Sequence, residues 1–164
     1  GGLVTLVDRK SRYTIITRIE SKHADHVYLR IKKCLNKLDR DHRHSVTFDN
    51  GTEFSDCDRL RRYPGIELYV ADPGRPHQRG TNENTNGLIR QFYPKGTPMR
   101  RIAHHQVRAV QTLLNNRPRA CLDYQTPNEV FLDKPTPENC NRVCRPPFDC
   151  EEWSVFCADH GCRS

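Results

Sequence analysis

The stretch Leu3-Val-Thr-Leu-Val-Asp-Arg-Lys-Ser-Arg-Tyr-Thr-Ile-Ile-Thr-Arg-Ile19 decides the fold class. Two runs rich in β-branched residues, 3–8 and 13–19, flank the polar segment 9–12, and this pattern predicts a β-hairpin. Apolar residues then recur at helical spacing over 23–38, which predicts a helix with Ser21 as its N-cap. The chain therefore opens with antiparallel strands followed by a helix.

Short strands and helices alternate in the rest of the chain. The apolar pattern predicts strands at 46–48 and 66–71 and helices at 55–63, 81–92, 104–116 and 126–131. The order β-β-α-β-α-β-α-α is typical of an α/β fold in which helices flank a mixed sheet. We expect one domain over 1–134 and an irregular, Cys-rich tail over 135–164, where prolines interrupt the pattern.

The charge balance favours a polyanionic partner. Lys and Arg number 27 against 20 Asp and Glu, and the pI is about 9.1. Such an excess favours phosphate binding through counterion release, although a basic protein without such a partner is the simpler alternative. The sequence has no run of about 18 apolar residues and no signal-peptide pattern, so we expect neither a membrane partner nor export. The Gly-Gly start without Met indicates an N-terminal truncation.

Asp49 and Glu83 are the candidate metal-binding carboxylates. Asp49 ends a predicted strand, where α/β sheets gather their sites, but Asp-Asn-Gly is also an ordinary turn sequence. Glu83 lies near the start of a predicted helix, where an acidic residue also suits the helix dipole. The surrounding Asn residues are poor helix formers, so stability alone does not explain them. Short amides at a helix start can instead bind phosphate or a base edge, which makes Asn82 and Asn86 candidate DNA contacts.

Several motifs together resemble one family. Asp49 and Glu83 are separated by 33 residues, and the motifs are Leu-Val-Asp-Arg-Lys-Ser-Arg-Tyr (6–13), Thr-Phe-Asp-Asn-Gly-Thr-Glu-Phe (47–54), Gln-Arg-Gly-Thr-Asn-Glu-Asn-Thr-Asn-Gly (78–87) and Asn-Asn-Arg-Pro-Arg (115–119). They resemble insertion-sequence transposases of the IS-thirty family over about residues 3–134. The resemblance implies a ribonuclease-H-like catalytic core, as in integrases.

The resemblance also implies an activity and its partners. Family members cleave DNA at insertion-sequence ends and join it to target DNA, using three carboxylates that hold two Mg²⁺ or Mn²⁺ ions. Asp49 would be the second carboxylate and Glu83 the third. The resemblance further implies a homo-oligomer in the full-length protein and a bacterial cytoplasmic, nucleoid-associated location.

The first carboxylate of the family is expected to be missing. In the family it lies on a strand that precedes the segment at which this chain begins. Asp8 is a poor substitute, because it matches the end of the second strand and suits a turn cap. We therefore predict that the sheet lacks its first strand and that the chain alone is inactive. A catalytically dead, DNA-binding remnant is the alternative, and the Asn-rich segment argues against a nuclease for another substrate.

Basic residues near Glu83 are the other candidate DNA contacts. Arg90 shares a helix face with Glu83, and Arg75 and Arg79 lie in the preceding loop. The basic start of the helix at 104–116 opposes its own dipole, which favours phosphate contact over stability as the explanation. In the tail, Cys140, Cys144, Cys150, Cys157, His160 and Cys162 could bind zinc, but their spacing fits no familiar zinc module.

Overall fold

The computed structural model describes residues 1–72, 80–132 and 152–158. Short 3-10 helices include η2 (Thr52–Arg62) and η4 (Met99–Arg101). None of the described helices is long and apolar enough to cross a membrane. The main elements are β1 (Gly2–Asp8), β2 (Thr14–Ile19), α1 (Ala24–Leu35), β3 (Ser45–Phe48), β4 (Glu67–Val70), α2 (Gly80–Phe92), α3 (His104–Asn115), α4 (Pro127–Leu132) and β5 (Glu152–Ala158).

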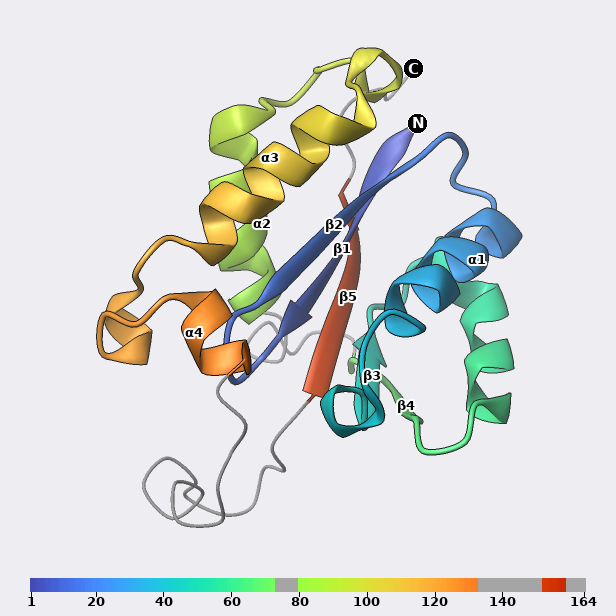
Figure 1. The fold of residues 1–164 in the computed structure, drawn as a ribbon. Helices are drawn as coiled ribbons and strands as arrows, with labels where there is room; N and C mark the ends of the chain where they lie inside the picture. The colour runs from blue at the N-terminus through green and yellow to red at the C-terminus, as the bar shows by residue number, and fades with distance from the viewer. Residues whose placement is uncertain (73–79, 133–151, 159–164) are drawn as a thin grey trace.

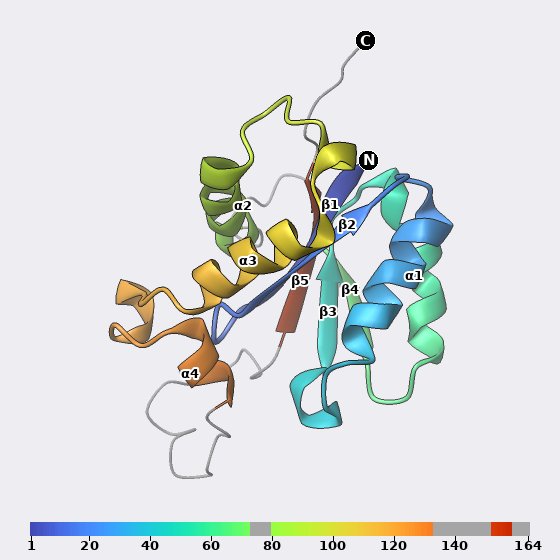
Figure 2. The same cartoon turned by 45° about the horizontal axis from the view of Figure 1, so that its top comes forward.

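The strands form one mixed sheet in the order β2-β1-β5-β3-β4. β1 is antiparallel to both β2 and β5, whereas β3 is parallel to both β5 and β4. Helix α1 and η2 cover one face, and α2 and α3 cover the other (Figures 1 and 2). The predicted α/β sandwich of helices around a mixed sheet is confirmed.

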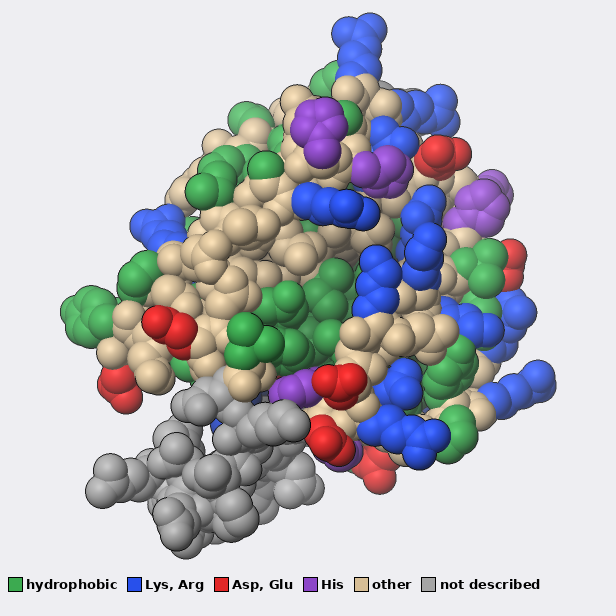
Figure 3. Space-filling model, in the orientation of Figure 1, with side chains coloured by type: hydrophobic (Ala, Val, Ile, Leu, Met, Phe, Trp, Pro, Cys, Tyr) green, Lys and Arg blue, Asp and Glu red, His purple; other side chains and the backbone are tan. Residues whose placement is uncertain are grey.

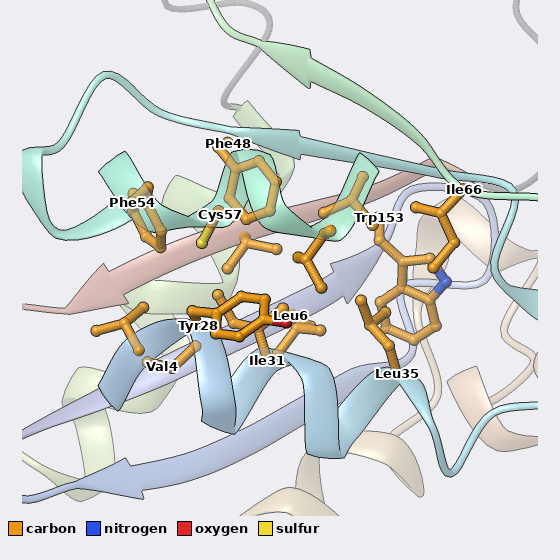
Figure 4. Packing of buried hydrophobic residues seen from close by; sticks show 14 of the residues in the cluster. Val4, Leu6, Tyr28, Ile31, Leu35, Phe48, Phe54, Cys57, Ile66 and Trp153 are labelled. Carbon is orange, nitrogen blue, oxygen red and sulfur yellow. The ribbon is translucent and has the colours of Figure 1, made fainter. Parts of the chain in front are cut away.

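Strand alternation divides the core between the two faces of the sheet. Val4 and Leu6 of β1 point into the larger cluster with α1 and η2, while Leu3 points into the smaller cluster with α2 and α3. In the larger cluster, aromatic rings from β3 and η2 pack against the apolar side of α1 (Figure 4). A sheet buried on both faces explains why β1 is buried throughout.

The prediction of an irregular tail is wrong for 152–158. These residues form β5, which pairs on one side with β1 and on the other with β3. Trp153 is fully buried, and its indole Nε1 donates to the backbone oxygen of His42 at 2.7 Å. The place between β1 and β3 offers backbone hydrogen-bond partners on both sides of the strand. The missing position that we expected in the sheet is thus occupied by a C-terminal strand.

One local prediction is wrong, and another is corrected in helix type and bounds. Ser21 is not the N-cap of α1: His23 holds that position without a side-chain cap, and the Ser21 hydroxyl accepts the His23 N–H at 3.3 Å. The segment predicted as a helix over 55–63 is the longer 3-10 helix η2, whose Phe54, Cys57 and Leu60 are buried at a spacing of three. The i, i+3 spacing of a 3-10 helix aligns these side chains on one face.

Candidate active site

Asp49 directly follows β3, as predicted, and is half-buried. Its Oδ1 accepts the Gly51 N–H at 3.1 Å, which is the side-chain turn that the simpler interpretation of Asp-Asn-Gly predicts. The neighbouring Asn50 Nδ2 donates to the backbone oxygen of Ala71 at 2.7 Å. This bond ties the loop after β3 to the end of β4, so the position of Asp49 is fixed by two adjacent strands.

Helix α2 presents Glu83 and Arg90 on its exposed side, with Gly87 between them. A Cβ built on Gly87 would meet no atom within 4 Å, so the surface above this helix turn is open. The three positions are separated by four and three residues and therefore share one helix face. This exposed strip is a face on which a phosphate backbone could lie close to Glu83.

Asn82 and Asn86 lie on the opposite, inner side of α2. Both are 6% exposed, and the Oδ1 atom of each is buried without a hydrogen-bond partner. Together with Thr85 and Ile89 they follow the i, i+3, i+4, i+7 pattern of a buried helix face, which packs against β5 and β1. We predicted both asparagines as DNA contacts, but in this conformation their side chains face the protein interior.

Asp8 caps the turn between β1 and β2. It is 4% exposed, and its Oδ2 accepts the Ser11 N–H at 2.7 Å and the Ser11 hydroxyl. Within this turn, Arg12 adopts a left-handed backbone with φ of 60°, and its guanidinium donates to the hydroxyl of Thr81. The turn therefore holds the first residues of α2, a link that the sequence did not indicate. This geometry supports the structural role that we predicted for Asp8.

The direction of α2 relates Glu83 to Asp49. The Arg12–Thr81 bond places the start of α2 at the end of β1, and Ile89 then packs in the cluster that contains Leu3 at the start of β1. Because β1 is antiparallel to β5 and β5 is parallel to β3, α2 runs in the direction of β3. The helix thus passes the level of Asp49.

Two predicted DNA contacts, Arg75 and Arg79, lie outside the described residues.

The register of β5 against β3 places the acidic position of this strand away from Asp49. In the register of β3 and β5, Phe48 pairs with Val155, so the next positions of β5 are Phe156 and Cys157. The acidic residue of β5, Glu152, pairs with Ser45 at the opposite end of β3. Among the described residues, no group of three or more His, Cys, Asp or Glu could hold a metal ion. The six predicted zinc ligands of the tail lie outside the described side chains.

Comparisons with known proteins give relatives for most of the chain. It is 44% identical to the transposase InsI for insertion sequence element IS30A of Escherichia coli over 129 residues, which are 79% of this chain and 34% of that protein. It is 37% identical to the transposase for insertion sequence element IS4351 of Bacteroides fragilis over 131 residues, 80% of this chain and 40% of that protein. The chain spans about a third of the length of these relatives. No protein-family model matches it.

Solved structures of integrases share the fold. The catalytic core domain of BIV integrase superposes with a TM-score of 0.59 at 20% identity, covering 79% of this chain and 85% of that chain. A chain of a simian T-cell lymphotropic virus intasome, solved in complex with PP2A regulatory subunit B56 gamma, gives a TM-score of 0.64 at 17% identity and covers 90% of this chain and 51% of that chain. The predicted integrase-core, ribonuclease-H-like fold is confirmed.

Proposed function

We propose, from the homology of this chain to insertion-sequence transposases, that it is the catalytic-core segment of an enzyme that cuts and joins DNA. The observation that carries the proposal is the 44% identity to a transposase over 79% of the chain. The integrase-core fold supports the same class of reaction. Insertion-sequence ends and target DNA would be the substrates, and such a protein would act on bacterial chromosomal DNA in the cytoplasm as a homo-oligomer.

Asp49 and Glu83 are the residues that we propose as metal ligands. Carboxylate oxygens are the ligands that Mg²⁺ prefers, and Mn²⁺ accepts the same donors. A bound pair of such ions would activate the attacking oxygen and stabilise the leaving oxygen at phosphorus. Within the described residues this site is not complete, because Asp49 and Glu83 belong to no group of three or more His, Cys, Asp or Glu that could hold a metal ion.

The two sides of α2 and its first turn have separate roles in the proposal. The exposed strip at Glu83, Gly87 and Arg90 would receive the DNA strand, with Arg90 neutralising a phosphate. The buried side of the helix would position Glu83 through its packing on β1 and β5. The Arg12–Thr81 bond would fix the first turn of the helix, so Arg12 is a positioning residue.

The incomplete carboxylate set leads us to propose that this chain alone does not join DNA. The test is a strand-transfer assay with Mn²⁺, the 164-residue chain and DNA carrying insertion-sequence ends. We expect no product above the protein-free control. Robust joining by this chain would overturn the proposal of inactivity.

A chimera tests the carboxylates themselves. Residues 3–132 would replace the matching segment of the Escherichia coli IS30A transposase, which supplies the parts that this chain does not span. We expect the chimera to join DNA ends, and Asp49→Asn or Glu83→Gln to lower the rate by about 10²–10³-fold, since metal ligation contributes several kcal/mol to the transition state. Asp56→Asn, an exchange of the same kind in η2, is the control. Joining by the Asp49→Asn chimera at the control rate would contradict the assignment.

A catalytically dead, DNA-binding remnant is the second candidate. The described residues favour it, because they contain no group of three or more His, Cys, Asp or Glu that could hold a metal ion. This candidate requires that the chimera bind DNA with the affinity of the intact transposase and still fail to join it. Mn²⁺-dependent joining by the chimera would eliminate this candidate.

A further inference from the structure

A basic groove runs along the free edge of the sheet, between α1 and α3. It has a volume of about 350 Å³, and the side chains of β2 form its floor. Lys and Arg side chains gather between the two helices, beside a hydrophobic patch (Figure 3). We call this surface the edge groove and define it by six cationic or titratable residues: Arg18, Arg30, Lys33, Lys37, His104 and Arg108.

Both walls of the edge groove carry basic residues a few positions apart in the chain. Arg30 and Lys33 of α1 are three residues apart and share one helix face, and Lys37 follows in the turn after the helix. His104 and Arg108 of α3 are four residues apart and are both exposed. Among the described residues, no acidic side chain lines the groove.

Three of the groove cations are not neutralised by acidic side chains of the described residues. Lys33, Lys37 and Arg108 form no ion pair with any Asp or Glu in the described part of the chain. The field of the α1 side is felt at Cys34: burial, the larger cause, raises the pKa of its thiol, while Lys37, Arg30 and Lys33 lower this pKa. An anion in the groove would meet the same positive field.

Arg18 differs from the other five residues because it is held by the protein. Its Nη1 donates to the backbone oxygen of Ile102 at 2.7 Å, and its Nη2 lies 3.8 Å from Glu20. These bonds attach the segment before α3 to β2. Arg18 therefore attaches the α3 wall to the floor of the groove, whereas the exposed cations remain available to a ligand.

The edge of β2 is closed to an added strand. The Thr14 N–H donates to Asn115 Oδ1 at 2.9 Å, and the Ile16 N–H donates to Gln111 Oε1 at 3.0 Å. The Nδ2 of Asn115 also donates to the backbone oxygen of Thr14 at 2.9 Å. Side chains of α3 thus occupy the backbone groups that a peptide strand would need. A second copy of the chain is disfavoured as well, because two basic grooves would face each other.

We propose that the edge groove binds the sugar-phosphate backbone of a nucleic acid. This inference rests on the proposed function for its choice of DNA as the natural polyanion. The groove is separate from the carboxylates, because two strands, β1 and β5, lie between β2 and β3, about 14 Å across the sheet. DNA would therefore contact the protein at two places, the exposed strip of α2 and the edge groove.

The first experiment measures binding of the intact 164-residue chain to labelled duplex and single-stranded DNA of equal length over a range of salt. The groove variant is Lys33→Gln/Arg108→Gln, and the matched control, Arg62→Gln/Lys95→Gln, removes two exposed charges outside the groove. We expect the slope of log affinity against log salt to fall by about 2 in the groove variant and less in the control, since each phosphate contact contributes about one unit. Equal slopes in the two variants would overturn the proposal.

The second experiment observes the groove directly through Cys34. Alkylation of this thiol is followed by peptide mass spectrometry in the wild-type chain, with Cys121, which is exposed and outside the groove, as the internal reference. We expect saturating DNA to slow alkylation at Cys34 and to leave Cys121 unchanged. Protection by polyglutamate but not by DNA would overturn the proposal in favour of an acidic protein partner.

The experiments test the groove proposal and the carboxylate assignment separately. Thermal melting within a few degrees of the wild type shows that each variant is folded. A normal salt slope in the groove variant refutes the groove alone, and a failed joining assay with the chimera refutes the carboxylate assignment alone.

Discussion

At the scale of single residues, α2 separates polar side chains that look alike in the sequence. Asn82, Glu83 and Asn86 occur within five positions, yet Glu83 is exposed and both asparagines are buried. The sequence predicted the helix and its Glu83–Arg90 face correctly. It did not predict which asparagines turn inward, because the inner side of this helix lacks the apolar pattern that normally marks burial.

Gly87 gives a test of the exposed strip. Its helical position and the open space around a built Cβ mean that Gly87→Ala should raise the free energy of unfolding by about 0.5–1 kcal/mol. Urea unfolding of the intact chain measures this change. If a DNA strand lies on the strip, the same substitution should weaken DNA binding at constant salt. A loss of stability would show that the space above Gly87 is not open.

Cys57 gives a test of the larger core cluster through pH. Burial, with smaller contributions from Asp56 and Asp58, raises the pKa of its thiol to about 12 from 9.0. The folded state therefore favours the neutral thiol. The stability that this preference contributes is complete below pH 9 and is lost as the pH rises toward 12.

The measurement for Cys57 is a difference between two proteins. Between pH 9 and 11, the wild type should lose about 1.4 kcal/mol per pH unit more than Cys57→Ala, because one pKa unit corresponds to that energy. Cys121→Ala, at an exposed thiol, is the control and should follow the wild type. Parallel pH curves for the wild type and Cys57→Ala would contradict the assigned shift.

At the scale of elements, β5 is the feature that sequence reasoning missed. Leu3 to Asp8 and Thr14 to Ile19 are recognisable because long β-branched runs flank a polar turn. Residues 152–158 lie inside a stretch rich in Cys and Pro, and neither a local pattern nor the family resemblance predicts a strand of the sheet there. The pairing partners of β5 are distant in sequence, which local patterns cannot reveal.

Trp153 tests whether β5 holds the sheet together. Its ring is fully buried, meets the Phe131 ring edge-on at 5.9 Å and donates to the His42 oxygen. Trp153→Ala should lower the free energy of unfolding by about 3–5 kcal/mol, the usual range for removing a buried aromatic ring. Phe92→Ala, at a ring that is 42% exposed, should change it by less than about 1 kcal/mol. Equal effects of the two substitutions would place Trp153 outside the core.

At the scale of the whole molecule, the sheet depends on strands from both ends of the chain. A chain ending at residue 132 would leave β1 and β3 with unpaired inner edges. We expect it to lose cooperative urea unfolding, because the sheet would divide into two pairs of strands. A synthetic peptide of residues 150–160 in excess should restore part of the transition. Cooperative unfolding of the shortened chain with the stability of the full one would contradict this expectation.

The central position of β5 also bears on when the fold can form. Leu3 pairs with Ala158, so β1 leaves the ribosome long before its partner has been synthesised. Pairing of segments so far apart requires closure of a long loop, and the associated loss of chain entropy slows folding. Until then, the inner edges of β1 and β3 are exposed on the nascent chain and open to pairing with other chains. Synthesis of residues 152–158 is therefore the event that commits this protein to its native sheet.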